Sequence, residues 1–269
     1  MSNTFSITMN STTIIADAAS VLPAVTAVEL SLPDNKTTNY QEVCDFCKTS
    51  RTALRQLFES ANIQPHFHSA IYGNTVDIGS EDSEFREFSR CSIAENIEFA
   101  EAITAGDLVF HSKYKPDCFP LAKSARAARY LATLEKLILK AERHNIRLLV
   151  ENVSDPDPIW LNYLLDKFPT PHLAVCIDIG HINHFGQKNI TEMISGIGVN
   201  IASFHVHDND GSDDQHLHPQ SGTVNWAEFV DSVKKYTPDA RLNLELFAPY
   251  TPVEKFEHIL TLKNWFEVS

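Results

Sequence analysis

Histidine and carboxylate residues follow short apolar segments at six successive places in the chain. They are His68, His111, Glu151, Asp178, His181, His205, Asp214, His216 and Glu245. An ionisable group directly after buried apolar residues is costly unless it is paired or bound to a metal. Mixed imidazole and carboxylate ligands suit Zn²⁺, Mn²⁺ or Fe²⁺, whereas Mg²⁺ and Ca²⁺ prefer oxygen ligands alone. The pattern therefore predicts a divalent metal site.

The spacing of these residues adds to the prediction. In Asp178-x-x-His181 the carboxylate finishes an apolar run and the imidazole returns from the following loop. In Asp214-x-His216 an extended backbone would point both side chains to the same side. Each residue alone has a structural alternative: Asp178 could be a helix N-cap, and a glutamate could pair with an arginine. The metal prediction rests on the coincidence of all six segments.

The elements that must position these residues alternate between short apolar strands and longer helical patterns. We expect strands at Phe5–Met9, Ala27–Ser31, Ile63–His68, Asp107–His111, Ile146–Glu151, Leu173–Asp178, Ile201–His205 and Leu242–Glu245. Continuous apolar runs such as Leu148–Val150 are typical of parallel strands covered by helices on both faces. In a closed barrel the strand ends would meet at one mouth, where active sites are built.

Helical patterns lie between the strands, at Tyr40–Ala61, Ser92–Ala105, Ala122–His144, Trp226–Tyr236 and Val253–Phe266. Ser92 and Glu95 have the spacing of a capping box, and Gly106 is a candidate helix terminator. The rival to a barrel is an open doubly wound sheet. No GxGxxG or GxxxxGK[ST] motif follows a strand, so we predict a single (β/α)₈ TIM barrel over residues 1–269.

Composition restricts the classes of function. The formal net charge of −13 argues against nucleic acid as a partner, and no block of Lys and Arg suggests a membrane surface. No segment approaches the about 18 apolar residues of a membrane span, and Met1–Ser11 lacks a secretion pattern, so we expect a cytoplasmic protein. Five scattered cysteines indicate reduced thiols, and the Cys44-x-x-Cys47 spacing alone is weak evidence for metal or redox chemistry.

Taken together, these segments resemble the xylose isomerase-like barrels, which include sugar-phosphate isomerases and epimerases and the endonuclease IV type of nuclease. The resembling stretches are His68–Tyr72, Val109–His111, Val150–Asn152, Asp178–His181, His205–Asp208, Asp214–His216 and Leu244–Leu246. They occur in family order over roughly residues 63–247. The resemblance implies one to three metal ions and, because barrels of this group often pair, a possible homodimer.

The resemblance implies a specific division of the ligands. A main ion would be held by Glu151, Asp178, His205 and Glu245. A second ion would be held by His68 and His111 with Glu151 bridging, and a third by His181, Asp214 and His216. One departure concerns the substrate: where the family often has Gly-Glu-Gly, this chain has Gln220-Ser221-Gly222, which puts the usual glutamate contact in doubt.

Other residues near the predicted mouth are candidates for binding the substrate. His207 and His218 could donate hydrogen bonds, although each could equally be a plain loop residue. Lys113 could attract a phosphate group, although an exposed lysine is the commoner explanation. The aromatic residues Tyr72 and Trp226 could form a pocket wall or simply pack.

Two catalytic functions and one binding function fit the predicted site. In a metal-dependent sugar or sugar-phosphate isomerase or epimerase, Glu151 and Glu245 would be an acid/base pair acting on the C–H next to a carbonyl. In a phosphoesterase of the endonuclease IV type, several metals would activate water. A non-catalytic, metal-bound carbohydrate-binding module is the third alternative. We favour the isomerase or epimerase, acting on a small sugar or sugar phosphate.

Overall fold

Eight parallel strands form a closed barrel in the computed structural model, which describes residues 4–10, 25–31, 40–69, 76–186, 188–246 and 250–267. Each strand pairs with the next along the chain, and the last pairs with the first. The strands are β1 (Phe5–Asn10), β2 (Ala27–Ser31), β3 (Gln64–His68), β4 (Asp107–His111), β5 (Arg147–Glu151), β6 (Leu173–Asp178), β7 (Ile201–Val206) and β8 (Arg241–Leu244). The predicted (β/α)₈ barrel is confirmed, and each predicted strand boundary lies within one residue of the observed one.

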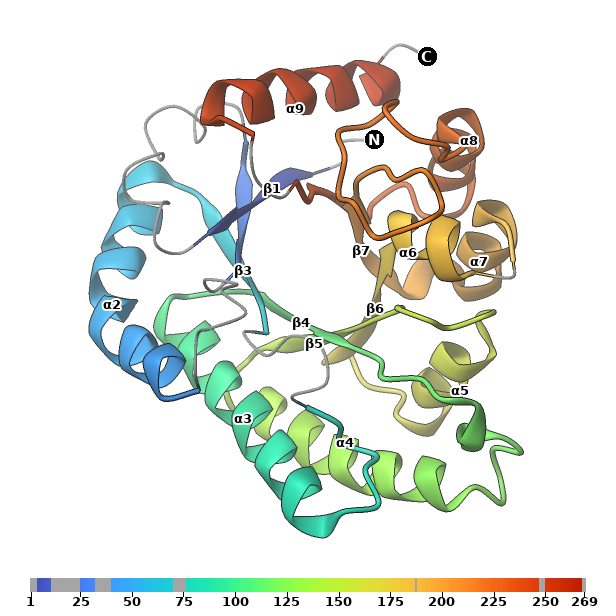
Figure 1. Ribbon diagram of the computed structural model, residues 1–269. Coiled ribbons are helices and arrows are strands. Elements are labelled where there is room, and N and C mark those ends of the chain that lie inside the picture. Colours follow the sequence, from blue (N-terminus) through green and yellow to red (C-terminus); the bar gives the residue numbers. More distant parts are fainter. Residues whose placement is uncertain are drawn as a thin grey trace.

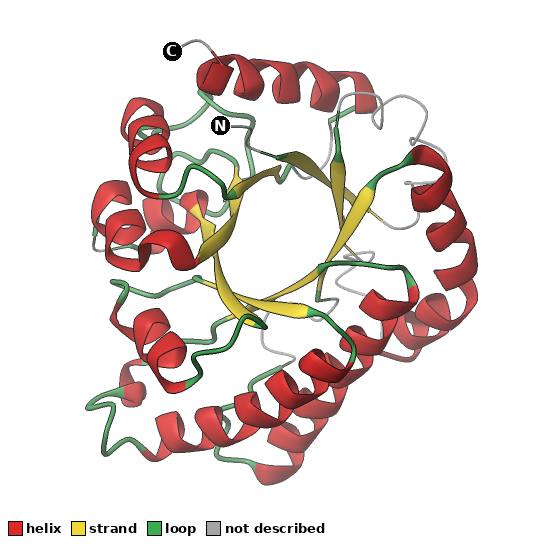
Figure 2. Ribbon diagram, turned by 180° about the vertical axis from the view of Figure 1, so that it is seen from behind, coloured by secondary structure: helices red, strands yellow, loops and turns green. Residues whose placement is uncertain are grey.

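Helices surround the barrel in both views (Figure 1, Figure 2). They are α2 (Tyr40–Ala61), α3 (Ser83–Ala102), α4 (Ala125–Arg143), α5 (Ile159–Lys167), α6 (Ile179–Phe185), α7 (Ile190–Ile197), α8 (Trp226–Tyr236) and α9 (Pro252–Glu267), with 3₁₀ turns η3 (Pro116–Cys118) and η4 (Gly198–Asn200). Among the described residues, no helix is both long enough and apolar enough to span a membrane.

Two sequence predictions about helix ends are wrong. Helix α3 begins nine residues before Ser92, because the Asp82 carboxylate caps it by accepting the backbone N–H groups of Glu84 and Phe85. Ser92 is a buried residue within the helix. Gly106 does not terminate this helix either, since Thr104, with φ 61°, takes the left-handed position.

The barrel interior differs from the usual layers of branched aliphatic side chains. The large apolar core lies between strands and helices, while a separate small cluster contains only Val109, Leu149, Ala174 and Cys176, from β4, β5 and β6. Buried polar side chains occur along the remaining strands, including Glu29 and Asn243, both 0% exposed. Polar groups buried in this way need partners, which are provided by other interior side chains.

Polar and charged residues near the starts of four strands form a largely buried network at the amino-terminal end of the barrel. The Asp107 carboxylate lies 2.6 Å from Arg241 Nη1, 2.8 Å from Arg147 Nε and 3.0 Å from His66 Nδ1. Burial alone would raise the pKa of Asp107, but His66 and the two arginines lower it well below its usual value. This network links β3, β4, β5 and β8.

Candidate metal centre

The predicted ligands converge at the carboxyl ends of the strands, where the strand register aligns several of them. His111 is opposite Glu151 across the β4–β5 pair, and Asp178 is opposite His205 across the β6–β7 pair. The side chains fall into three groups, each of which contains the residues that the resemblance assigned to one ion.

The first group, here called the His205 group, is arranged around one imidazole nitrogen. His205 Nδ1 lies 3.1 Å from Glu245 Oε2, 3.3 Å from Glu151 Oε1 and 3.8 Å from Asp178 Oδ2. All four residues are at most 3% exposed. Three carboxylate oxygens from different strands therefore face one buried imidazole.

The second group, the His68 group, shares Glu151 with the first. Glu151 Oε2 lies 3.0 Å from His68 Nε2 and 3.5 Å from His111 Nε2, while Oε1 of the same carboxylate faces His205. One glutamate thus presents an oxygen to each group, which is the arrangement that a bridging metal ligand needs.

The third group, the Asp214 group, lies nearer to the surface. Asp214 Oδ2 is 3.3 Å from His181 Nε2 and 3.2 Å from His216 Nε2, and the Asp214 side chain is 29% exposed. His181 Nδ1 is also 3.5 Å from Glu151 Oε1, so the three groups form one continuous cluster.

In the absence of metal, the carboxylates of the cluster raise the pKa of several of its histidines. Burial lowers the pKa of a histidine, but Glu151 raises that of His68 to about 9, and Asp178 with Asp214 raises that of His181 to about 10. His111 differs: burial, with His68 and Lys113 nearby, lowers its pKa to about 4, so its imidazole is neutral. The cluster holds protons where a cation would satisfy the same negative charge.

Unpartnered atoms test whether the residues fit a metal. His205 Nδ1 and Asp214 Oδ1 are buried and have no hydrogen-bond partner among the described residues, although carboxylate oxygens surround the imidazole nitrogen. Buried polar groups rarely stay unpaired, and a nitrogen among three carboxylate oxygens offers a metal coordination site. The donor set of imidazoles and carboxylates fits Zn²⁺, Mn²⁺ or Fe²⁺.

Sequence reasoning missed two residues that contact the cluster. Glu29, on β2, places Oε1 at 2.9 Å from His205 Nε2, with both residues fully buried. Asn152 accepts the backbone N–H of Asp178 on its side-chain oxygen at 2.8 Å, and its own carbonyl lies 2.8 Å from His181 Nδ1. Such neighbours fix the orientation of metal ligands. A glutamate inside an apolar strand was the available clue for Glu29.

The predicted substrate-binding residues have varied surroundings. His207 is fully buried and contacts Asp178 and His216. His218 stacks on His258 with ring centroids 4.4 Å apart. The Trp226 indole N–H donates to Asp208 Oδ2 at 2.9 Å, which fixes the ring at the start of α8. Tyr72 lies outside the described residues.

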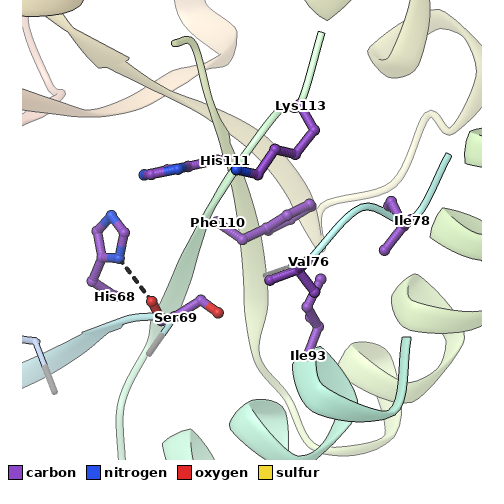
Figure 3. A pocket seen from close by; sticks show the side chains of 8 residues that line it. All are labelled: His68, Ser69, Val76, Ile78, Ile93, Phe110, His111 and Lys113. Atoms are coloured by element: carbon purple, nitrogen blue, oxygen red, sulfur yellow. Dashed lines mark hydrogen bonds between the residues drawn. The ribbon is translucent and has the colours of Figure 1, made fainter. Parts of the chain in front are cut away.

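Lys113 lies beside a pocket next to the His68 group. Figure 3 shows its side chain together with His68, Ser69 and His111, with apolar side chains beside them. The pocket is lined by His68, Ser69, Val76, Ile78, Ile93, Phe110, His111 and Lys113. Burial lowers the pKa of Lys113. This lysine is therefore partly removed from solvent at the edge of the cluster.

Curated relatives match parts of the chain. The uncharacterized protein MJ1311 of Methanocaldococcus jannaschii is 27% identical over 173 residues, which cover 62% of this chain and 59% of that protein. A probable endonuclease 4 of Thermoplasma volcanium is 26% identical over 147 residues, or 49% of each chain. The matched region therefore spans less than two thirds of either relative.

Solved structures match nearly the whole chain. A D-tagatose 3-epimerase-like protein has a TM-score of 0.77 at 22% identity and covers 98% of this chain and 97% of its own. The TTHB071 protein from Thermus thermophilus, soaked with ZnCl₂, has a TM-score of 0.77 at 18% identity and covers 98% of each chain. The model of the family described as xylose isomerase-like TIM barrel matches residues 21–264. The chain belongs to the xylose isomerase-like TIM barrel family.

Proposed function

We propose that this protein is a metal-dependent isomerase or epimerase of a small sugar or sugar phosphate. The observation that carries the proposal is the convergence of Glu151 and Glu245 on His205 Nδ1, at 3.3 and 3.1 Å. Two carboxylates beside one candidate metal position are the groups that proton removal and proton return require.

The main ion would be held by Glu151, Asp178, His205 and Glu245. When bound, it would supply a Lewis acid that polarises the substrate's carbonyl and adjacent hydroxyl. Glu151 ends β5 and Glu245 follows β8, so the carboxylates approach from different sides of the barrel mouth. One would take the proton from the hydroxyl-bearing carbon next to the carbonyl. The other would return a proton to the opposite face of that carbon in an epimerisation, or to the former carbonyl carbon in an isomerisation.

The electrostatic surroundings of the two glutamates determine how well they accept a proton. Burial would raise the pKa of each carboxyl, but His205 and neighbouring histidines lower both well below the usual value. Both side chains are therefore ionised at neutral pH, which is the form that accepts a proton. A carboxylate with a low pKa is a weak base, so proton abstraction by either glutamate requires that bound metal and substrate raise its pKa toward the working pH.

A small substrate fits the surroundings of the site. The candidate ligands of the His205 group are at most 3% exposed, so only a small molecule that enters the mouth could reach them. Lys113, beside the His68 group, would pair with a phosphate if the substrate carries one. Solved structures with this fold include an L-ribulose 3-epimerase, with a TM-score of 0.77 at 11% identity, and the D-tagatose 3-epimerase-like protein.

Proton exchange in D₂O tests the proposal. The metal-loaded protein should incorporate deuterium next to the carbonyl of ketoses or their phosphates, as detected by NMR or mass spectrometry. E151Q and E245Q should lose the exchange, while E59Q, which changes an exposed glutamate on α2, should retain it. Sugar binding without exchange would instead indicate a binding module. Absence of both sugar binding and exchange, together with cleavage of abasic DNA, would refute the proposal.

The Asp214 group supports a second candidate, a phosphoesterase with several metals. An isomerase reaction needs only the metal held by the His205 group. The Asp214 and His68 groups would hold two further ions, which would support in-line attack on a phosphodiester. The partial match to a probable endonuclease 4 points the same way. The net charge of −13 opposes binding of a DNA backbone. The two candidates are separated by assaying exchange and abasic-DNA cleavage on the same metal-loaded preparation.

A further inference from the structure

His207 occupies a position between two of the ligand groups. It directly follows β7, is 0% exposed, and places Nε2 at 3.0 Å from Asp178 of the His205 group. Its ring stacks on His216 of the Asp214 group, with centroids 3.8 Å apart and planes inclined by 13°. This single imidazole therefore contacts one candidate ligand of the His205 group and one of the Asp214 group.

The contact with Asp178 fixes which nitrogen carries the proton. A carboxylate can only accept a hydrogen bond, so His207 donates from Nε2. His207 Nε2 lies 3.0 Å from both Asp178 oxygens, and Oδ1 also accepts the backbone N–H of His181 at 2.8 Å. Asp178 is thus held by a donor at each oxygen, which orients the carboxylate toward His205 without using all of its lone pairs.

Three neighbouring contacts keep the His207 ring in place. The backbones of Asp208 and Leu217 form a bridge with two 2.8 Å hydrogen bonds, which brings the loop carrying His216 back over the end of β7. Asn209 Nδ2 donates to the carbonyl of Gly180 at 2.8 Å, which ties the same loop to α6. At Gly180, a Cβ atom would lie 2.0 Å from His207 Cε1, so the backbone of α6 directly borders the ring.

We propose that His207 is a positioning residue that orients Asp178 through a hydrogen bond and His216 through ring stacking. This role rests on the proposed metal centre, since it concerns how two of the groups in that centre are held. Outer hydrogen-bond partners of metal ligands typically contribute about 10–100-fold to metal affinity.

Two substitutions separate the two contacts. H207F keeps a ring to stack on His216 but removes the donor to Asp178. H207Q keeps an amide N–H that can reach Asp178 but removes the ring. Zinc binding to the chelator-stripped protein, measured by competition with a chromophoric chelator, would be compared for both variants. E245Q and D214N serve as reference variants. The titration step weakened in E245Q is assigned to the His205 group, and the step weakened in D214N to the Asp214 group.

H207F should weaken zinc binding at the His205 group by about 10–100-fold and leave the Asp214 group unchanged. H207Q should do the reverse. H172F is the matched control, because His172 also uses a ring nitrogen, 2.9 Å from the carbonyl of Ile146, but at the opposite end of the barrel. It should bind zinc as the wild type does. Urea unfolding of each stripped variant shows that it is folded, and H207Q still tests the proposal if H207F does not fold.

Other results would overturn the proposal. Wild-type affinities in both His207 variants, or equal weakening of both groups in each variant, would refute the positioning role alone. Selective weakening of the Asp214 group in H207F would make His207 a zinc ligand of that group. A wild-type protein that binds no zinc would refute the metal centre as well. Because no substrate is present, these results are independent of the proposed reaction.

Discussion

Replacing Gly180 with alanine should destabilise the protein through a collision with His207. The added Cβ would lie 2.0 Å from Cε1, 2.5 Å from Nδ1 and 2.6 Å from Nε2 of the His207 ring. Non-bonded carbon atoms pack best at about 3.5–4.0 Å, so the ring must retreat by about 1.5 Å. A movement of that size is incompatible with the 3.0 Å hydrogen bond to Asp178 unless Asp178 also moves.

The expected cost follows from three contributions. Overpacking costs about 1–3 kcal/mol, and loss of a hydrogen bond to a charged group costs about 1.5–3 kcal/mol. Alanine is favoured over glycine in a helix by up to about 1 kcal/mol, and Gly180 lies in the first turn of α6. The free energy of unfolding should therefore fall by about 1.5–6 kcal/mol in G180A.

Urea unfolding in the presence of a chelator measures this change without a contribution from bound metal. G106A is the matched control, since a Cβ at Gly106 would meet its nearest atom at 3.6 Å, an ordinary contact distance. In an H207A background the penalty of G180A should largely disappear, because contacting residues give non-additive effects. A penalty that persists in that background, or a G180A protein as stable as the wild type, would refute the reasoning.

Two further predictions concern protons and metal. Because the pKa of Asp107 is held well below its usual value, the stability that this group contributes is present above about pH 4 and is lost as pH falls toward the folded-state pKa. The stability difference between wild type and D107N, measured by urea unfolding, should shrink from pH 6 to pH 3; a constant difference would contradict the assignment. Because the pKa values of His68 and His181 are raised to about 9 and about 10, zinc must displace protons, so its affinity should increase with pH between 6 and 9. Competition assays in buffers of different pH measure this, and a pH-independent affinity would count against it. Stripping the metal should lower the melting temperature, by an amount that grows with the logarithm of that affinity.

Much of the candidate site could be predicted from sequence because strand ends in a parallel barrel share one mouth. His111 and Glu151 end neighbouring strands and lie opposite each other in the register. The ligands of the three groups lie close together because each is at or just after the carboxyl end of a strand. The same logic applies to Glu29, whose position between Val28 and Leu30 resembles the outward-facing residue of a half-exposed strand. In a barrel both faces are buried, and Glu29 points to His205 instead.

Other features depend on contacts that no local pattern encodes. The capping-box spacing of Ser92 and Glu95 is genuine, but the helix had already begun at an aspartate ten residues before Ser92. The placement of His207 depends on how closely α6 approaches the end of β7, which is a property of tertiary packing. A histidine in a polar stretch therefore gave no indication that its side chain would be fully enclosed.

The unequal depth of the three groups has a kinetic consequence. His205 is completely enclosed, whereas His111 is 18% exposed and Asp214 is 29% exposed. An ion leaving the innermost position must pass these outer side chains, each of which can recapture it. An ion held by the outer side chains would be stripped quickly by a chelator, and one held at His205 slowly.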